Sequence, residues 1–418
     1  MKKIDFKFFK TREGKTVFSN ILSLGLLQVA GYVFPLLTMP YLARVLGVSC
    51  IGKIAFASAI IVYLQTLVDY GFNFTATRDI ARKRNDLEEV SKIYSSVLYT
   101  KICLLLIAAM ILSLLILIIP KMREEWPLLL TTFMLLPGYI VFPEWLFQGL
   151  EKMKFITILN IVSKFIFTVA VFIFIKSRED YLLQPLLTAG GYIVSGIIAM
   201  WIIRYKLGIH IISFCECNIC KTLKGSTDVF LNQLIPNLYN NFSIMLLGFF
   251  CGPMANGIYE AGSKLISIVE RLLNVILRAF FPFLARHANK HTTYAIGHFS
   301  LVVISSLILF IFSREFILIL FSEDFLDAVV VLRILSVSLL GLGLSHIYGT
   351  NYMIVLGKEK VLRNITLRNA LLGFVMSFPL IYFYGYIGAA LTVACTRLCL
   401  GISILIKSQA LKHNINKI

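Results

Sequence analysis

Three cations stand at a spacing of seven within one apolar stretch, from Gly257 to Phe283: Lys264, Arg271 and Arg278. Because seven residues of an α-helix turn through about 700°, the three side chains share one face over roughly 21 Å. A charge at bilayer depth costs about 2.5–3.5 kcal/mol, so such a row normally faces a watery cavity or the bundle interior. The row therefore predicts a cavity that binds anions, with structural ion pairing as the alternative.

The three members of this row are not equivalent. Glu260 lies four residues before Lys264 and can pair with it, which lowers the cost of burying both charges. Arg278 lies near the end of its stretch, where a long side chain can snorkel to the membrane surface. Arg271 is therefore the member that we most expect to meet a bound anion.

The preceding apolar stretch carries several amides on one helical face. Gln233, Asn237, Asn240 and Asn241 fall at i, i+4, i+7 and i+8. Amides at this depth hold helices together, or they hydrogen-bond a hydroxyl-rich cargo such as a sugar. We assign Asn237 and Asn241 to the predicted cavity.

Four other charged positions complete the candidate site. Lys164 and Arg397 lie inside apolar stretches, and for both we weigh a place in the cavity against interhelical pairing. Asp69 and Glu260 are the candidates for coupling transport to a proton or a sodium ion.

Signatures of catalysis and of metal binding are missing from the sequence. There is no Gly-rich phosphate loop followed by Lys and Ser or Thr, and no nucleophile-elbow Ser. The cluster Cys215-Glu216-Cys217-Asn218-Ile219-Cys220 lacks the paired spacing of a zinc site. We therefore expect a transporter with no catalytic residue, no metal and no bound cofactor.

The composition places these residues in a membrane. Of the 418 residues 58% are hydrophobic and 15% are charged, and the mean hydropathy is +0.83. A spanning helix takes about 20 apolar residues, and about 12 such stretches fit along the chain. Since lipid leaves unpaired backbone groups without partners, we predict an all-α integral membrane protein. The spans are expected at about residues 18–46, 52–73, 97–119, 128–148, 157–176, 183–203, 229–250, 257–282, 297–320, 328–350, 366–384 and 386–406.

The basic residues follow the positive-inside rule rather than a nucleic-acid pattern. The net charge is +18, but Lys and Arg gather before the first span and in alternate connections, such as 204–227 and 358–368. This distribution predicts that both termini are cytoplasmic. We expect no nucleic-acid partner.

A short pattern recurs in the two halves of the chain at an offset of 205 residues: Gly47, Gly52 and Ser58 reappear as Gly252, Gly257 and Ser263. Each set lies in the turn between the first two spans of its half. This predicts parallel repeats, and transporters built in that way bind cargo between the halves. We expect a six-helix lobe over 1–210, a cytoplasmic connection over 211–227 and a second six-helix lobe over 228–418.

The N-terminal third carries a resemblance to a known family. Its motifs are Pro40-Tyr41-Leu42-Ala43-Arg44-Val45-Leu46-Gly47, Gly52, Asp69-Tyr70-Gly71-Phe72 and Ala76-Thr77-Arg78-Asp79-Ile80-Ala81. With these motifs the run from Pro35 to Arg84 resembles the polysaccharide biosynthesis (Wzx-type) flippases of the multidrug/oligosaccharidyl-lipid/polysaccharide exporter superfamily. Beyond this run the resemblance rests on the number and topology of the spans.

The resemblance implies a MATE-like bundle of two lobes that alternates between inward-open and outward-open states. It implies a cargo of undecaprenyl-pyrophosphate-linked oligosaccharide, carried across the bacterial inner membrane for O-antigen (lipopolysaccharide), capsule or exopolysaccharide synthesis. The implied partners are this cargo, membrane lipids, and a polysaccharide polymerase with its chain-length regulator. Proton or sodium coupling is common in the superfamily.

Three alternatives stay open. A multidrug exporter of the same superfamily expels cations and would favour acidic cavity residues, so the basic row argues against it. A lipid II flippase is closer in chemistry but usually carries more than 12 spans. A membrane glycosyltransferase or polysaccharide polymerase would need outer carboxylates, which the short connections do not supply.

Overall fold

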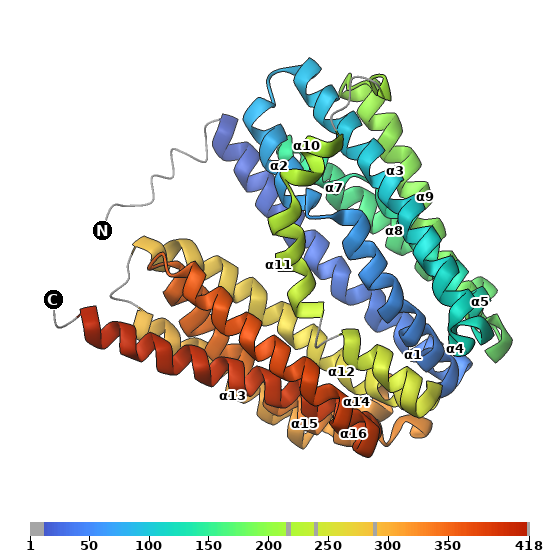
Figure 1. Cartoon of the computed structure of the whole chain (residues 1–418), viewed down its shortest axis with the longest axis vertical. Helices are drawn as coiled ribbons and strands as arrows, with labels where there is room; N and C mark the ends of the chain where they lie inside the picture. Colours follow the sequence, from blue (N-terminus) through green and yellow to red (C-terminus); the bar gives the residue numbers. More distant parts are fainter. Residues whose placement is uncertain (1–11, 215–218, 238–240, 287–290, 416–418) are drawn as a thin grey trace. The chain divides into compact units, whose positions relative to one another are not determined.

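The computed structural model describes residues 12–214, 219–237, 241–286 and 291–415 (Figure 1). Helices make up most of this part of the chain, and it contains no β-strand. The predicted all-α class is therefore confirmed. The N-terminal lysines before residue 12 and most of the cysteine cluster, residues 215–218, lie outside the described residues.

The helices of the first half are α1 (Arg12–Asp69), α2 (Phe72–Lys83), α3 (Leu87–Ile118), α4 (Pro120–Glu124), α5 (Trp126–Phe133), α6 (Leu135–Val141), α7 (Glu144–Gly149), α8 (Met153–Phe174) and α9 (Leu183–Trp201). Those of the second half are α10 (Ile219–Lys224), α11 (Thr227–Asn237), α12 (Asn241–Arg286), α13 (His291–Ile311), α14 (Ser313–Leu320), α15 (Ala328–Leu344) and α16 (Glu359–Ile415). A π-helix, η3 (Ile202–Lys206), continues α9, and a second, η7 (Ser345–Ile354), continues α15.

Among the described residues, 9 helical segments are long and apolar enough to cross a membrane. Three helices contain a glycine with non-helical backbone angles at which two helices join: Gly47 in α1, Gly252 in α12 and Gly385 in α16. Each of these glycines lies near a predicted boundary between two spans. The structure is thus consistent with the predicted number of about 12 spans.

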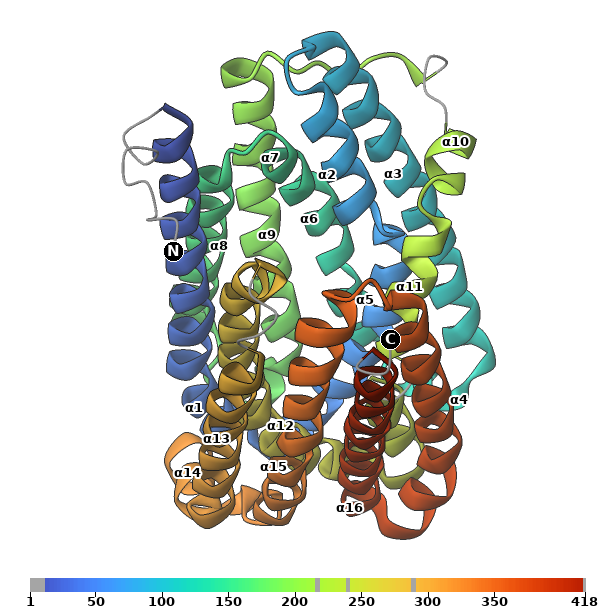
Figure 2. The same ribbon diagram turned by 90° about the vertical axis from the view of Figure 1, so that its left-hand side faces the viewer.

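The chain divides into two compact units. The first unit comprises Met1–Tyr41 and Ile60–Leu234, and the second comprises Leu42–Ala59 and Ile235–Ile418. In the first unit α9 packs against α6 and α8, and α2 packs against α3 and α7. In the second unit α15 packs against α12, α13 and α16, with α13, α15 and α16 side by side in both views (Figures 1 and 2).

The predicted repeat is visible in the backbone of the second unit. Gly47 has φ 74° and ψ 174°, and its counterpart Gly252 has φ 83° and ψ −176°, a region that favours glycine. The helical turns that follow these two glycines pack against each other in a reciprocal way. A Cβ on Gly52 would lie 1.7 Å from the carbonyl oxygen of Pro253, and a Cβ on Gly257 would lie 2.1 Å from that of Val48.

This contact is symmetric in sequence as well as in space. Val48 and Pro253 are themselves separated by the same offset of 205 residues as Gly52 and Gly257. Each repeat therefore places the same glycine against the same carbonyl group of the other repeat. Only glycine allows two backbones to approach so closely.

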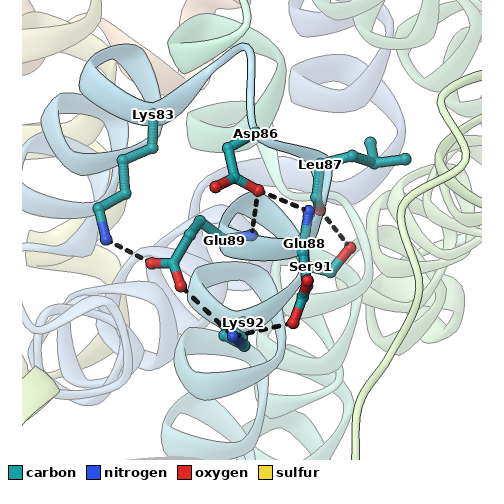
Figure 3. Close-up of polar contacts among 7 residues, drawn as sticks. All are labelled: Lys83, Asp86, Leu87, Glu88, Glu89, Ser91 and Lys92. Atoms are coloured by element: carbon teal, nitrogen blue, oxygen red, sulfur yellow. Dashed lines mark hydrogen bonds and ion pairs between the residues drawn. The ribbon is translucent and has the colours of Figure 1, made fainter.

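The connection between α2 and α3 is a short turn closed by charged groups (Figure 3). The Asp86 carboxylate accepts hydrogen bonds from the backbone N–H groups of Glu88 and Glu89, both at 3.1 Å, and thereby caps α3. Lys92 pairs with Glu88 at 3.0 Å and with Glu89 at 3.4 Å, and Lys83 also pairs with Glu89. These groups are largely exposed, so they fix the start of the helix without burying charge.

One face of α3 exposes a row of large apolar side chains. Leu106, Met110, Leu114 and Leu117 follow one another at helical spacing, and their exposed fractions are 66%, 66%, 55% and 65%. A continuous apolar stripe of this kind is unfavourable in water and is normal against lipid. The chain is a multi-pass membrane protein.

Candidate functional site

A pocket of about 260 Å³ lies inside the second unit, between α12, α15 and α16. Most of the α12 residues that line it come after Gly252, between Tyr259 and Glu270, where they recur every three or four positions along one side of the helix. The polar residues of the lining are Asn241, Tyr259, Glu260, Ser263, Lys264, Ser267, Glu270 and Arg397. Two cations, two carboxylates, three hydroxyls and an amide therefore converge on one space.

Arg397 of α16 reaches across the bundle to two other helices. Its guanidinium forms an ion pair with Glu270 of α12 and donates a hydrogen bond to the Ser338 hydroxyl of α15 at 3.4 Å. The side chains of Arg397 and Glu270 are only 13% and 21% exposed. Charges in such surroundings are retained only where they are paired, so this ion pair fixes three helices around the pocket.

The Lys264 ammonium lies 3.4 Å from the Glu260 carboxylate, one helical turn away. The pairing expected from their spacing is present. Lys264 remains 38% exposed, and the contact is long for a charge-assisted hydrogen bond. The ammonium is therefore held near the pocket but loosely, and an anion can compete with Glu260 for it.

The cations of the predicted row lie in different surroundings in the structure. Lys264 lines the pocket, whereas the Arg271 side chain is exposed on α12 and is not part of the lining. Arg271 lies on the same face as Lys264 but two helical turns further along α12, so it is separated from Lys264 along the helix axis rather than around it. The backbone of Arg278 is part of α12, but its side chain lies outside the described residues.

The two predicted amides lie together. The Asn241 Nδ2 donates to Asn237 Oδ1 at 2.8 Å, and Asn241 also lines the pocket. Asn237 ends α11 and Asn241 begins α12, so the pair links the ends of these two helices.

The other predicted residues, Asp69 and Lys164, belong to a buried polar network in the first unit. Asp69 pairs with Lys101 at 2.8 Å, and the Lys101 side chain is only 3% exposed. Glu144 accepts a hydrogen bond from Asn160 at 2.6 Å. Lys101, Lys164 and Asp69 all interact electrostatically with Glu144, so these groups act as one network.

Reasoning from the sequence missed two charged residues of these sites, Glu270 and Lys101. Each was visible as a charge inside an apolar stretch. Their partners lie on other helices, with 127 residues between Glu270 and Arg397 and 32 between Asp69 and Lys101. No local spacing signals such a pair, unlike that of Glu260 and Lys264.

Chemically, the pocket is suited to binding an anion that also carries hydroxyl groups. Both of its cations are held by carboxylates, so the empty pocket holds no uncompensated charge of its own. An incoming phosphate can replace either carboxylate as the partner of Lys264 or Arg397. The hydroxyls and the amide provide donors and acceptors for further oxygens.

Comparison with known proteins shows the family to which the chain belongs. A family model described as "Polysaccharide biosynthesis protein" matches residues 17–288 of the 418. A protein of Escherichia coli (strain K12) named "Putative O-antigen transporter" is 30% identical over 395 residues, which cover 93% of this chain and 95% of that protein. A protein of Shigella dysenteriae with the same name is 30% identical over 391 residues, which cover 90% and 96%.

Two solved structures share the fold. One is an inward-facing multidrug resistance MATE family transporter of the MOP superfamily, with a TM-score of 0.70 and 14% identity over 95% of this chain and 99% of that one. The other is the lipid II flippase MurJ in an inward closed conformation, with a TM-score of 0.72 and 14% identity over 94% and 87%. The predicted MATE-like architecture is confirmed.

Proposed function

Because the chain belongs to the polysaccharide biosynthesis protein family, we propose that it is a flippase for undecaprenyl-pyrophosphate-linked oligosaccharide units. It carries these units across the bacterial inner membrane for the synthesis of O-antigen, capsule or exopolysaccharide. The names of its relatives support O-antigen as the first product to test. It is a transporter and not an enzyme.

The observation that supports this proposal best is the convergence of Lys264 and Arg397 on one pocket inside a membrane-spanning unit. A pyrophosphate loses its hydration when it crosses an apolar core, and only cations in its path can replace that hydration. Its sugar part needs hydroxyl and amide partners, which Ser263, Ser267 and Asn241 provide. The polyprenyl tail can stay in lipid.

The paired state of the cations gives the transport cycle its physical basis. Without cargo, Glu260 and Glu270 neutralise Lys264 and Arg397. With cargo bound, the phosphates replace the carboxylates as partners of the two cations. The charges of Lys264 and Arg397 are therefore compensated both with and without cargo, and the second unit can change conformation in either case. Arg271, Arg278, Asn237 and Lys164 are proposed to contact the cargo elsewhere on its path.

Further elements of the proposal follow from the family. We place the termini in the cytoplasm, and the two lobes at 1–210 and 228–418. Asp69 and Glu260 remain the candidates for proton or sodium coupling. A polysaccharide polymerase and a chain-length regulator are the expected partners.

Complementation tests the proposal. A bacterial strain that lacks its own O-antigen flippase receives this chain, and its lipopolysaccharide is separated on a gel. We expect the wild-type chain to restore the O-antigen ladder, Lys264→Ala and Arg397→Ala to reduce it at least about tenfold, and Lys264→Arg to retain most of it. Lys360→Ala, which removes an exposed lysine at the start of α16, is the matched control.

Two results would count against the proposal. Full activity of both alanine variants at normal expression would exclude the pocket as the cargo site. Resistance to cationic drugs without any O-antigen would favour the alternative, a multidrug cation antiporter.

A further inference from the structure

Two histidines lie beside each other in the interior of the second unit, and neither lines the charged pocket. His298 comes from α13 and His346 from η7, with ring centroids 5.6 Å apart. Their residues are only 3% and 6% exposed. Histidine is the side chain whose ordinary titration range spans neutral pH, so a histidine pair is a candidate site for a proton.

Three of the four ring nitrogen atoms have no hydrogen-bond partner among the described residues. Neither nitrogen of His298, nor the Nδ1 of His346, makes a hydrogen bond to any residue that the structure describes. A buried polar group without a partner costs about 1–3 kcal/mol of stability. The pair therefore does not stabilise the fold, and its free nitrogen atoms point instead to a small bound species such as water or a proton.

A column of aromatic rings leads from this pair to a cavity. Tyr294 stacks on His298 with centroids 5.3 Å apart, and His291 follows Tyr294 at 6.4 Å. His291, with Tyr348 and Tyr352, lines a cavity of about 490 Å³ between α13, η7 and α16. That volume is large enough for several water molecules, which can deliver protons to the column.

The backbone around His346 is itself unusual. Residues 345–354 form a π-helix of 10 residues, and π-helical turns occur preferentially at functional sites. The same segment contributes the buried Asn351, whose Oδ1 also has no hydrogen-bond partner among the described residues. A second polar atom thus faces this region without a partner.

The pair is connected to the charged pocket through Arg397. The charge of Arg397 acts on His346, as does that of His298. Four helices, α12, α13, α15 and α16, pack around η7, and the groups that act on His346 are His298 of α13 and Arg397 of α16. Arg397 in turn contacts Ser338 of α15 and Glu270 of α12. A proton on the pair therefore adds positive charge next to the anion pocket.

We propose that His298 and His346 form a proton-binding site, and that proton binding there and anion binding at Arg397 favour each other. A hydronium ion that reaches the cavity transfers its proton to the lone pair of an imidazole nitrogen, which leaves a water molecule behind and forms an imidazolium. Its charge repels Arg397 and attracts an anion in the pocket, so each ligand raises the affinity of the protein for the other. The anion half rests on the proposed function, and the proton half does not.

The proton half is tested by nuclear magnetic resonance on the full-length protein in lipid nanodiscs with isotope-labelled histidine. We expect at least one imidazole to change its protonation state within the pH range over which the protein stays folded. Arg397→Gln removes a neighbouring cation and should raise the midpoint of His346 by about one pH unit, whereas Arg397→Lys should not. Arg333→Gln, which removes a cation elsewhere in the second unit, is the control.

A second variant, for which the midpoint of His346 should shift in the opposite direction, keeps the test decisive if Arg397→Gln does not fold. Glu270→Gln removes a carboxylate beside Arg397 and should lower the midpoint of His346, by less than about one pH unit. Absence of titration in both histidines, or a midpoint that moves with neither Arg397→Gln nor Glu270→Gln, would overturn the proton site.

The anion half is tested with inorganic pyrophosphate as the probe. Its addition to the weakly buffered protein should cause proton uptake, which a pH-indicator dye records, and the double variant His298→Gln/His346→Gln should abolish the uptake. His210→Gln, which replaces an exposed histidine of the first unit, should retain it. Calorimetry separates the outcomes, since pyrophosphate binding without proton uptake overturns the coupling, whereas no pyrophosphate binding contradicts the proposed function of the pocket.

Discussion

At the scale of single residues, the two units hold their buried charges in different ways. Lys101 and Asp69 form a contact of 2.8 Å with the Lys101 side chain almost completely buried, whereas Lys264 and Glu260 stand 3.4 Å apart with side chains 38% and 23% exposed. The removal of one partner of a buried pair leaves an uncompensated charge, which costs about 3–5 kcal/mol, while an exposed pair contributes about 1 kcal/mol or less. The first pair is thus held tightly, whereas the second can exchange partners more readily.

This difference predicts the effect of two similar substitutions on stability. Lys101→Met should lower the free energy of unfolding by about 3–5 kcal/mol, and Lys264→Met by about 1 kcal/mol or less. Thermal unfolding of the purified protein in detergent measures both. The double variant Asp69→Asn/Lys101→Met should recover part of the loss, because it leaves no unpaired charge. Equal losses for Lys101→Met and Lys264→Met would contradict this division of roles.

The sequence reveals charges inside spans more readily than their partners. Each residue that we assigned to the site from the sequence was recognised because a charged or amide side chain is costly in an apolar stretch. Glu260 was paired correctly with Lys264 because both lie on one helix, where a spacing of four brings side chains together. The partner of Arg397 is set by the packing of α12 against α16, and the sequence carries no local signal for it.

At the scale of helices, the reciprocal glycine contact between the two repeats should be highly sensitive to an added methyl group. Gly52→Ala and Gly257→Ala each place a Cβ within 2.1 Å of a backbone oxygen, which cannot move without the helix that carries it. We expect each to destabilise the second unit by about 2 kcal/mol or more. Thermal unfolding of the variants in detergent measures this effect.

Two other glycines provide matched controls for that experiment. A Cβ on Gly190 of α9 or on Gly297 of α13 would meet no atom within 4 Å. Alanine at these positions should therefore be neutral or should stabilise the protein by about 0.5–1 kcal/mol, because alanine favours the helix. Losses as large as those of Gly52→Ala would show that the contact between the repeats has no special role.

The cap of α3 supports a prediction of smaller magnitude. Asp86→Ala removes the acceptor for two backbone N–H groups at the start of the helix and should cost about 1 kcal/mol. Asp86→Asn keeps an acceptor and should cost less. The protection of the first turn of α3 against hydrogen exchange reports the change directly, and unchanged protection in Asp86→Ala would contradict the capping role.

Features of the helices could be predicted from the sequence where they depend on residues close together in the chain. The repeat of Gly47 at Gly252 indicated equal turns, and both glycines have the same left-handed φ. The π-helix at residues 345–354 has no such signature, because it depends on the packing of α15 and η7 against α13 and α16. The packing of Leu42–Ala59 with the second unit was equally hidden, since the close approach of two glycines is a property of the folded chain.

At the scale of the whole molecule, the topology depends on whether α12 crosses the membrane once or twice. The structure joins its two parts at Gly252, where the backbone leaves the helical conformation. If the chain reverses there, three crossings separate Gly225 from Glu323, and these two positions lie on opposite sides of the membrane. If α12 crosses once, two crossings separate them and they lie on the same side.

We expect opposite sides, because Lys224 and its basic neighbours favour the cytoplasm while Glu323 lies in an acidic connection with Asp324 and Asp327. Alkaline phosphatase inserted at Glu323 should be active and should be inactive at Gly225, and a fluorescent protein that folds only in the cytoplasm should give the reverse pattern. Insertion at Lys358, one crossing beyond Glu323, should match Gly225 and serves as the control. The same phosphatase result at Gly225 and Glu323, whether inactive at both or active at both, would show that α12 crosses once, and the predicted number of about 12 spans would then be wrong.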